Sequence, residues 1–235
     1  MSRSAQLAAL AALLADNTRA AFCLALLDGR AWTASELAAH AGVAPSTASE
    51  HLGRLVRGGL LVERRQGRHR YVQLAGPRAA ELVELLASRL DAVPDPPRTL
   101  RGSRVSEALA RGRTCYDHLA GRLGVAITDA MAARGLLELT GGCALTADGT
   151  TWLTGPLGAD PGQLRGTRRP LARACLDWTE RRTHLAGVAG AVVCSRLFAG
   201  GWVRRVGSDR AVRLTPSGAD ALRDLLNLDP EPLTA

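Results

Sequence analysis

The sequence predicts a mainly α-helical protein with small β-hairpins, and three observations support this fold class. Aromatic residues make up only 3% of the 235 residues, so the cores must be built from Leu, Val and Ala, and Leu and Ala favour helices. Capping signals and Gly or Pro punctuation divide the first part of the chain into helices followed by two strands. The second half contains an internal repeat whose copies each end in a short hairpin and a capped helix.

Two helices begin the chain. Apolar periodicity predicts them over residues 4–15 and 18–28. Asn17 or Thr18 is the expected N-cap of the second helix, because both side chains can accept a hydrogen bond from the first turn. Gly29 stands just past the end of this helix, where glycine commonly terminates one.

Two more helices follow at close spacing. Thr33 and Glu36 form a capping-box pattern, which predicts a third helix that ends at Gly42. A fourth helix is predicted to start at Pro45, since proline is favoured in the first helical turn, and to end before Gly58-Gly59. The short connection between the third and fourth helices is typical of a helix-turn-helix.

A hairpin and a final helix complete this part of the chain. Residues 60–64 and 69–74 are predicted strands joined by a turn at 66–68, and β-favouring Tyr and Val support the second strand. Gly and Pro then precede a predicted helix over residues 77–90. Residues 92–103 are rich in Pro and read as a linker. The order of elements predicts a winged helix-turn-helix.

We therefore expect a winged helix-turn-helix domain over residues 1–91 and a second domain over 104–235. In the second domain, residues 118–121 (His-Leu-Ala-Gly) recur as residues 184–187. The shared unit is predicted to be helix, helix, short hairpin and capped helix, which makes the region two degenerate winged-helix-like units. Further positions match at the same offset: Gly124 with Gly190, Ala133 with Ala199, and residues 135–139 with 201–205.

The fourth helix has the character of a DNA-recognition helix. Small polar side chains stand at its start, where such a helix enters the major groove, and they can bond base edges or phosphates. Ala48, Leu52 and Leu55 lie on the opposite face and are expected in the core. The alternative is that the hydroxyls are helix caps, that His51 is structural and that the wing is a solvated turn. The predicted DNA-binding residues are Ser46, Thr47, Ser49, His51, Arg54, Arg57, Arg64, Arg65, Arg68 and Arg70.

Residues 37–52 resemble the helix-turn-helix of ArsR/SmtB-type bacterial repressors. The matching positions are Ser46, Thr47, Ser49, His51 and Leu52, and with the Arg-rich wing the resemblance covers roughly residues 5–91. It implies a transcriptional repressor that binds an operator in double-stranded DNA. It also implies a homodimer built from the first helix and the helix at 77–90. Both standard metal sites of the family are missing, because residues 35–40 contain no Cys and residues 77–90 contain neither His nor Cys.

The signal is therefore expected to act on the second domain. Aromatic, acidic and basic residues cluster in two predicted helices that the repeat sets side by side, and such groups suit a small organic effector. The alternative is that Tyr116 and Trp178 are core residues and that the charged groups face solvent. The predicted effector-binding residues are Cys115, Tyr116, Asp117, His118, Trp178, Arg181 and His184.

A metal or redox signal is the alternative to an organic effector. Cys115 and His118 would share one helix face at i and i+3, while Cys175, His184 and Cys194 are available elsewhere. A Cys-x-x-His pair on one helix is a weak motif, and a buried Cys is usually a small apolar residue. We therefore expect no metal and no cofactor, with a metal- or redox-responsive regulator using Cys115, His118 and Cys175 as the alternative.

Other functional classes have less support. The sequence contains no Gly-x-Ser-x-Gly, His-Glu-x-x-His or Walker-type motif, so we expect no enzyme. A protein-interaction module is the other rival, but the Arg-rich first wing and the net charge of +8 favour a polyanionic partner. The second wing, at 140–143, is uncharged, whereas residues 204–210 leave the role of the third wing open.

The sequence also indicates the cellular compartment of the protein. Its five cysteines are an odd number with no close pair, which argues against a secreted disulfide framework. The apolar run over residues 5–14 lacks a small-residue cleavage site. No run reaches the about 18–20 apolar residues that span a bilayer. We therefore expect a cytoplasmic protein with no membrane partner.

Overall fold

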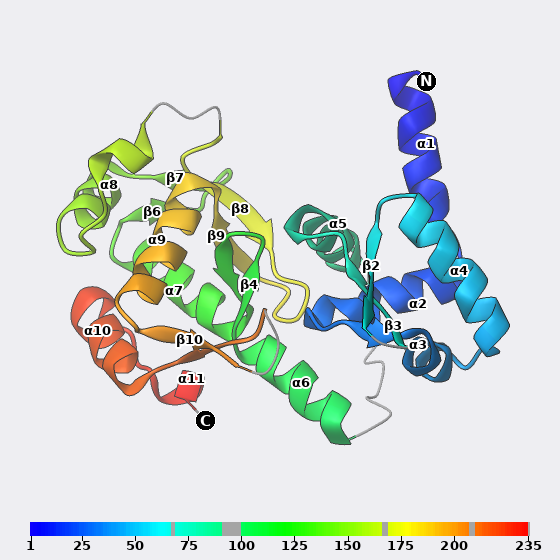
Figure 1. Cartoon of the computed structure of the whole chain (residues 1–235). Coiled ribbons are helices and arrows are strands. Elements are labelled where there is room, and N and C mark those ends of the chain that lie inside the picture. The colour runs from blue at the N-terminus through cyan, green and yellow to red at the C-terminus, as the bar shows by residue number, and fades with distance from the viewer. Residues whose placement is uncertain (67–68, 91–99, 166–168, 207–209, 235) are drawn as a thin grey trace. The chain divides into compact units, whose positions relative to one another are not determined.

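The computed structural model describes residues 1–66, 69–90, 100–165, 169–206 and 210–234. It divides into two compact units, Met1–Ala87 and Ser88–Ala235, and each is described by itself (Figure 1). The predicted linker, residues 92–103, lies mostly outside the described residues. Its last four residues belong to a helix that starts at Leu100, so the prediction of a linker is wrong for residues 100–103. This helix belongs to the second unit, in whose interior its residue Leu109 is buried.

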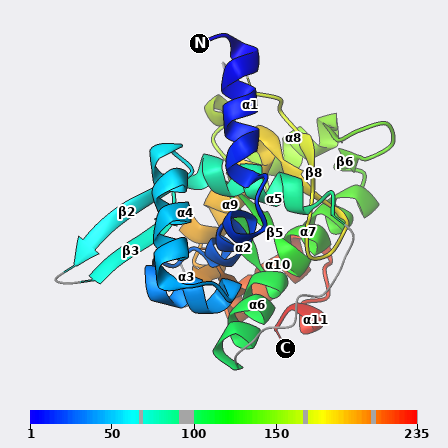
Figure 2. The same ribbon diagram turned by 90° about the vertical axis from the view of Figure 1, so that its right-hand side faces the viewer.

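Unit 1 is a helical domain with a three-stranded antiparallel sheet of order β1-β3-β2. Figure 2 shows β2 and β3 side by side, running out past α4. The two-residue strand β1 was not predicted, because it is too short to show any periodicity. The elements are α1 (Arg3–Leu14), α2 (Asn17–Ala25), η1 (Leu26–Asp28), β1 (Trp32–Thr33), α3 (Ala34–Ala41), α4 (Pro45–Arg57), β2 (Leu61–Gln66), β3 (His69–Leu74) and α5 (Pro77–Ala87).

Local signals set the ends of these helices. Thr33 and Glu36 form the predicted capping box, with Thr33 Oγ1 accepting from the Glu36 N–H and Glu36 Oε2 accepting from the Thr33 N–H. Gly42 then ends α3 at a φ of 68°, a conformation that favours glycine. The predicted cap of α2 is wrong. Asp16 caps that helix, because its carboxylate accepts the Arg19 N–H at 2.9 Å.

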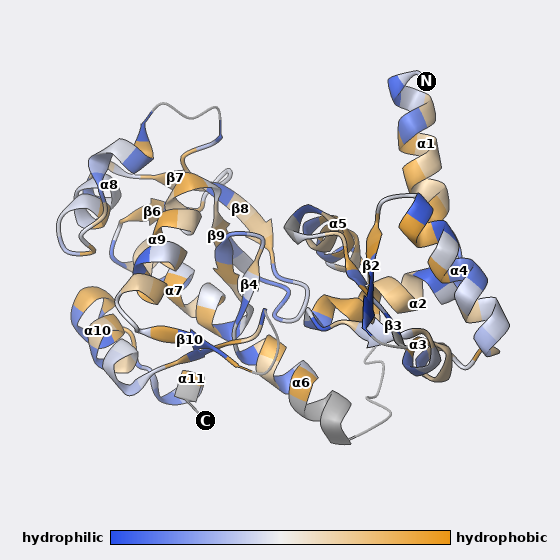
Figure 3. Cartoon of the chain, in the orientation of Figure 1, coloured by the Kyte–Doolittle hydropathy of each residue, from blue (hydrophilic) through white to orange (hydrophobic). Residues whose placement is uncertain are grey.

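The core of unit 1 lies between α2, α3, α4 and the sheet. Ala48, Leu52 and Leu55 are fully buried, as their spacing on α4 predicts, and so are Phe22 and Leu37. By contrast, α1 has no buried residue although much of it is apolar (Figure 3). Among the described residues no single helix has the length and apolarity to cross a membrane. Only α1 together with residues 17–28 passes that test, across an 82° bend.

Unit 2 is built from two similar halves. The first has α6 (Leu100–Arg111), β4 (Arg113–Cys115), β5 (His118–Ala120), α7 (Gly121–Ala133), β6 (Leu137–Glu138), β7 (Ala144–Leu145), α8 (Ala147–Thr154) and the short η2 (Pro161–Leu164). The second has β8 (Arg173–Leu176), β9 (Thr183–Ala186), α9 (Gly187–Ala199), β10 (Val203–Arg205), β11 (Val212–Leu214), α10 (Pro216–Leu226) and α11 (Glu231–Thr234).

Each half therefore repeats the order hairpin, helix, hairpin, helix. The expected order, with two helices before the hairpin, is wrong in its first element. Residues 113–120 form a hairpin in which Cys115 pairs with His118, so these two residues do not share a helix face. The reason is the tight turn between them, where Tyr116 has a φ of 57°. Positive φ values of this kind are typical of two-residue hairpin turns and end any helix.

The two halves share one core. The helix α7 packs against β9 of the second half, and α9 packs against β5 of the first, so each helix lies on the other half's hairpin. Buried Leu, Val, Ile and Met side chains from both halves form one continuous cluster, with Leu119, Met131, Leu153, Leu185 and Leu197 among them. This reciprocal packing makes unit 2 a single folding unit.

Candidate nucleic-acid interface

The start of α4 exposes hydroxyl side chains that cap nothing. Ala44 is the N-cap residue and makes no side-chain cap bond, and Pro45 is the first helical residue. Ser46 and Thr47 are followed by the third hydroxyl, Ser49, one turn along, and the two serines are not buried. None of the three hydroxyls has a hydrogen-bond partner within the described part of the chain. These hydroxyls therefore do not act as caps of α4, in contrast to the capping alternative.

Arginines follow along α4 and the wing formed by β2 and β3. Arg54 is exposed, and its Nη2 lies 2.7 Å from Glu50 Oε1. Within the wing, Glu63 forms ion pairs with both Arg65 (Nε–Oε1 3.3 Å) and Arg70 (Nε–Oε2 2.9 Å). Arg68 lies outside the described residues. One wing carboxylate thus offsets part of the charge of two predicted DNA-binding residues.

Two arginines of α4 and the wing are not paired with a carboxylate among the described residues. Arg57 at the end of α4 and Arg64 on β2 are exposed, and neither has a carboxylate partner among the residues that the structure describes. Arg64 lies opposite Tyr71 in the hairpin register. Cations of this kind attract phosphates without a competing internal ion pair.

His51 lies in a different environment from the serines. Its Nδ1 is 3.3 Å from Arg19 Nη1 and 3.5 Å from Asp16 Oδ1, and the ring is half-buried. Arg19 is itself buried and donates to the carbonyls of Leu13 and Ala12. The hydrogen bond from the Arg19 N–H is the main cause that lowers the pKa of Asp16. His51 therefore connects α4 to the junction of α1 and α2 through Arg19 and Asp16. This polar junction was not predicted from the sequence.

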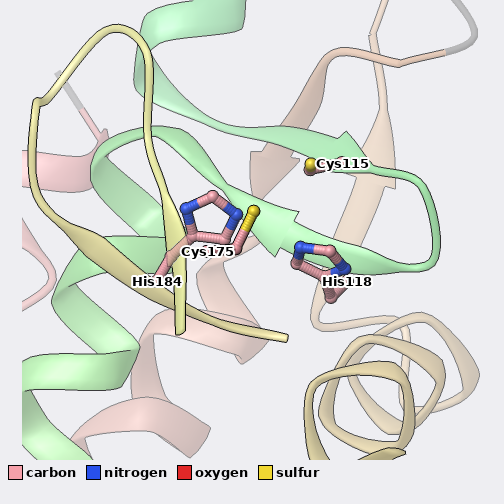
Figure 4. A group of neighbouring side chains, drawn as sticks. All are labelled: Cys115, His118, Cys175 and His184. Atoms are coloured by element: carbon pink, nitrogen blue, oxygen red, sulfur yellow. The ribbon is translucent and has the colours of Figure 1, made fainter. Parts of the chain in front are cut away.

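The structure divides the predicted effector residues. Cys115, His118 and His184 converge in the interior of unit 2, together with Cys175, which the effector prediction left out (Figure 4). The four come from the β4–β5 and β8–β9 hairpins. The pairing of Cys115 with His118 across a turn, rather than along a helix, is what brings them there.

The other predicted effector residues lie around ion pairs. Arg169 places its guanidinium 5.7 Å from the Tyr116 ring centroid and 2.6 Å from Asp117. Burial would raise the pKa of Asp117, but hydrogen bonds from His118 and Arg169, with the charges of both, outweigh it and lower that pKa to about 2. Trp178 stacks on Arg113 at 4.9 Å, and Arg181 occupies a turn with a φ of 56°.

Comparison with known proteins places the first unit. Residues 14–64, from the end of α1 into β2, match the family model described as a helix-turn-helix domain. Among the solved structures similar to part of the chain are two from mycobacteria. One is the homodimeric winged helix-turn-helix DNA-binding domain of Mb0332 from Mycobacterium bovis, a possible ArsR-family regulator (32% identity, TM-score 0.33, 37% of this chain and 82% of that one). The other is the cadmium sensor CMTR from Mycobacterium tuberculosis (39%, 0.31, 39% and 96%).

A curated relative covers both units. The uncharacterized HTH-type transcriptional regulator YdfF of Bacillus subtilis (strain 168) is 38% identical over 224 residues, which are 94% of this chain and 97% of that protein. The similarity thus runs through the helix-turn-helix and the duplicated second unit together. The chain belongs to the HTH-type transcriptional regulators, and its N-terminal unit contains the helix-turn-helix that the family model matches.

Proposed function

We propose that the chain is a homodimeric repressor that binds a specific operator through α4 and the β2–β3 wing. The observation that carries this proposal concerns the side chains in the first turns of α4. There the hydroxyls of Ser46 and Ser49 make no hydrogen bond within the described residues. A recognition helix presents its N-terminal residues to the major groove, where hydroxyls donate to or accept from base edges.

The arginines supply the sequence-independent part of binding. Arg57 and Arg64 have no internal carboxylate partner among the described residues, so they can neutralise phosphates at no cost in lost ion pairs. Arg54, Arg65 and Arg70 would have to share their charge with Glu50 or Glu63. We therefore assign register on the duplex mainly to Arg57 and Arg64, and base preference to the serines.

Dimerisation is proposed through α1 and α5. Leu7 on α1 is 67% exposed, and Leu85 and Leu86 on α5 are 50% and 47% exposed. Several exposed leucines on apolar helices are unusual on the surface of a monomer. A single unit contacts too few bases for specific binding in a genome, and a two-fold dimer doubles the site.

The proposal has two further parts, which the sequence suggests. The protein is cytoplasmic, and a small organic effector that binds unit 2 controls its affinity for DNA. The effector has the weaker support. A cavity of about 10 Å³, room for about one water molecule, lies between the halves and is lined by side chains that include Leu119, Ile127, Leu185 and Val193. Sites for organic ligands usually measure roughly 300–1,000 Å³. The cavity as it stands therefore has no room for an organic ligand.

Selection from a random pool of DNA duplexes tests the proposed function and requires no known operator sequence. The full chain should enrich a motif with two-fold symmetry, whose half-sites lie about 10 base pairs apart or a multiple of that. Ser49→Ala should enrich a different motif or a degenerate one. Enrichment of no motif over several rounds at low salt would overturn the proposal.

A further inference from the structure

We propose that Cys115, His118, Cys175 and His184 form a closed site for one zinc ion in unit 2. Their ligand atoms all lie within 4.8 Å of one another, and the side chains converge from two hairpins (Figure 4). Around a tetrahedral ion with zinc–ligand bonds of about 2.0–2.3 Å, the same atoms would stand roughly 3.3–3.8 Å apart. Small side-chain rotations therefore close the cluster around an ion.

The fold supplies these ligands symmetrically. Cys115 faces His118 across the β4–β5 hairpin, and Cys175 faces His184 across the β8–β9 hairpin. Directly opposed residues of an antiparallel pair project from the same face of the hairpin. Because β5 and β9 also contact each other, each half of unit 2 contributes one Cys-His pair to a shared centre.

Two glycines lie where the helices of unit 2 pass close to the hairpins. A Cβ atom at Gly190 on α9 would lie 3.1 Å from the His118 Cβ, and one at Gly124 on α7 would lie 3.7 Å from the His184 Cβ. Each helix also passes close to a backbone carbonyl, with the added Cβ 2.4 Å from the oxygen of Leu119 or Leu185. The absence of a side chain at Gly190 thus leaves space for His118 of the other half, whereas the distance at Gly124 is an ordinary van der Waals contact.

Buried nitrogen atoms in the cluster lack partners. His118 is 1% exposed, and its Nδ1 lies 3.4 Å from Asp117 Oδ1, which leaves Nε2 without a hydrogen bond among the described residues. His184 is equally buried. Neither of its ring nitrogens has a hydrogen-bond partner in the described chain, although Nδ1 lies 3.5 Å from Asp177 Oδ2. An unpaired buried nitrogen costs free energy that a bound ion at Nε2 would recover.

The carboxylates fit the outer shell of a metal site. A histidine that ligates through one nitrogen usually directs the other to a carboxylate, which orients the ring. Asp117 and Asp177 occupy that position for His118 and His184. Each half thus places a carboxylate near its histidine, within a hydrogen bond at His118 and at 3.5 Å without one at His184.

The donor set and its charge point to zinc. Two thiolates and two imidazoles are a usual set for tetrahedral zinc, whereas octahedral sites for Mg²⁺, Ca²⁺ or Mn²⁺ use oxygen ligands. A divalent ion with two thiolates and two neutral imidazoles has no net charge, so burying the site carries little electrostatic cost. Four protein ligands leave no open position, which makes the site one that holds the two halves together and not a catalytic one.

Metal content and cobalt spectroscopy of the full chain test the site. We expect the purified, reduced protein to bind one zinc per chain, and cobalt to replace it with the visible bands of a tetrahedral ion and a thiolate charge-transfer band of two-thiolate intensity. This spectrum is read on the unaltered protein, so the test does not depend on any variant folding.

Substitutions then assign the ligands. Cys175→Ser and His184→Ala should each lower zinc affinity by more than the roughly 10–100-fold that loss of an outer-shell partner costs. Cys143→Ser and Cys194→Ser remove cysteines outside the cluster and should bind as the parent does. Failure of the reduced chain to take up stoichiometric zinc or cobalt would overturn the proposal, as would a Cys115–Cys175 disulfide in place of metal. Operator binding by unit 1 is measured separately, so either proposal can fail alone.

Discussion

Arg113 and Asp177 form an ion pair that is almost wholly removed from solvent. Arg113 is 1% exposed and Asp177 0%, and Arg113 Nη2 lies 3.1 Å from both carboxylate oxygens. Asp177 also accepts from the N–H groups of Gly121, Thr179 and Glu180. Burial on its own would raise the pKa of Asp177, but Arg113 and these donors hold it below its usual range. The pair joins the first half of unit 2 to the second.

Removing one member of this pair should destabilise unit 2 strongly. We expect Asp177→Ala to lower the free energy of unfolding by about 3–5 kcal/mol, since it leaves a buried guanidinium without its partner. Urea denaturation of chelator-treated protein, followed through the tryptophans, measures the change. Asp220→Ala is the matched control, because its pair with Arg223 is exposed and should contribute less than about 1 kcal/mol. Equal losses in the two variants would contradict the role given to Asp177.

The cap at Asp16 predicts a dependence on pH. Asp16→Ala should cost about 1 kcal/mol near neutral pH, because the first turn of α2 loses its acceptor. The folded pKa of Asp16 lies below its ordinary value of 3.8, so its contribution is fully present above that value and lost as pH falls through the folded pKa. Thermal unfolding by circular dichroism at several pH values should show the variant and the parent converging under acid conditions. A constant difference would argue against a charged cap.

Salt dependence separates the wing arginines. Arg64→Ala should weaken binding to all duplexes and reduce the slope of log affinity against log salt by about one unit, since one phosphate contact is lost. Arg65→Ala should have a smaller effect, because Glu63 already shares its charge. Fluorescence anisotropy over a range of salt concentrations measures both slopes. An Arg65→Ala effect larger than that of Arg64→Ala would show that Glu63 releases Arg65 on DNA.

The proposed dimer can be tested on α5. Leu85→Glu places a charge on an exposed apolar face and should convert the chain to a monomer. The monomer should bind the operator at least about tenfold more weakly, which corresponds to about 1.4 kcal/mol. Light scattering after gel filtration gives the mass. Leu24→Glu on α2 is the control, as Leu24 is 42% exposed and lies outside the proposed interface. A dimeric Leu85→Glu protein would exclude α5 from the interface.

Local signals explain how much of unit 1 could be predicted. The Thr33–Glu36 box, Pro45 and the apolar spacing of α4 each act over a few residues, and each appears in the structure as predicted. Asp16 was missed because Asn17 and Thr18 are equally good caps by type, and only the backbone decides among them.

Unit 2 could be predicted only in part, because its decisive contacts are not local. The repeat revealed two halves, but the spacing of Cys115 and His118 fits a helix as well as a hairpin. The positive φ of Tyr116, which selects the hairpin, has no signal in the residue type. Cys175 and His184 pair across a longer turn, so the cysteines do not align in the repeat. Periodicity does not reveal cross-strand pairs of this kind, nor the Arg113–Asp177 pair.

The glycine at position 190 gives the last prediction. A Cβ there would lie 2.4 Å from the Leu185 carbonyl oxygen and 3.1 Å from the His118 Cβ, so Gly190→Ala forces α9 away from the hairpins. We expect a loss of about 1–3 kcal/mol in stability from overpacking, together with weaker zinc binding. Gly53→Ala is the matched control, since it also replaces a helical glycine but meets only the flexible end of Arg57 at 3.2 Å. It should leave zinc affinity unchanged and stabilise α4 by up to about 1 kcal/mol. If Gly190→Ala binds zinc as tightly as Gly53→Ala does, the close approach of α9 to His118 does not position that ligand.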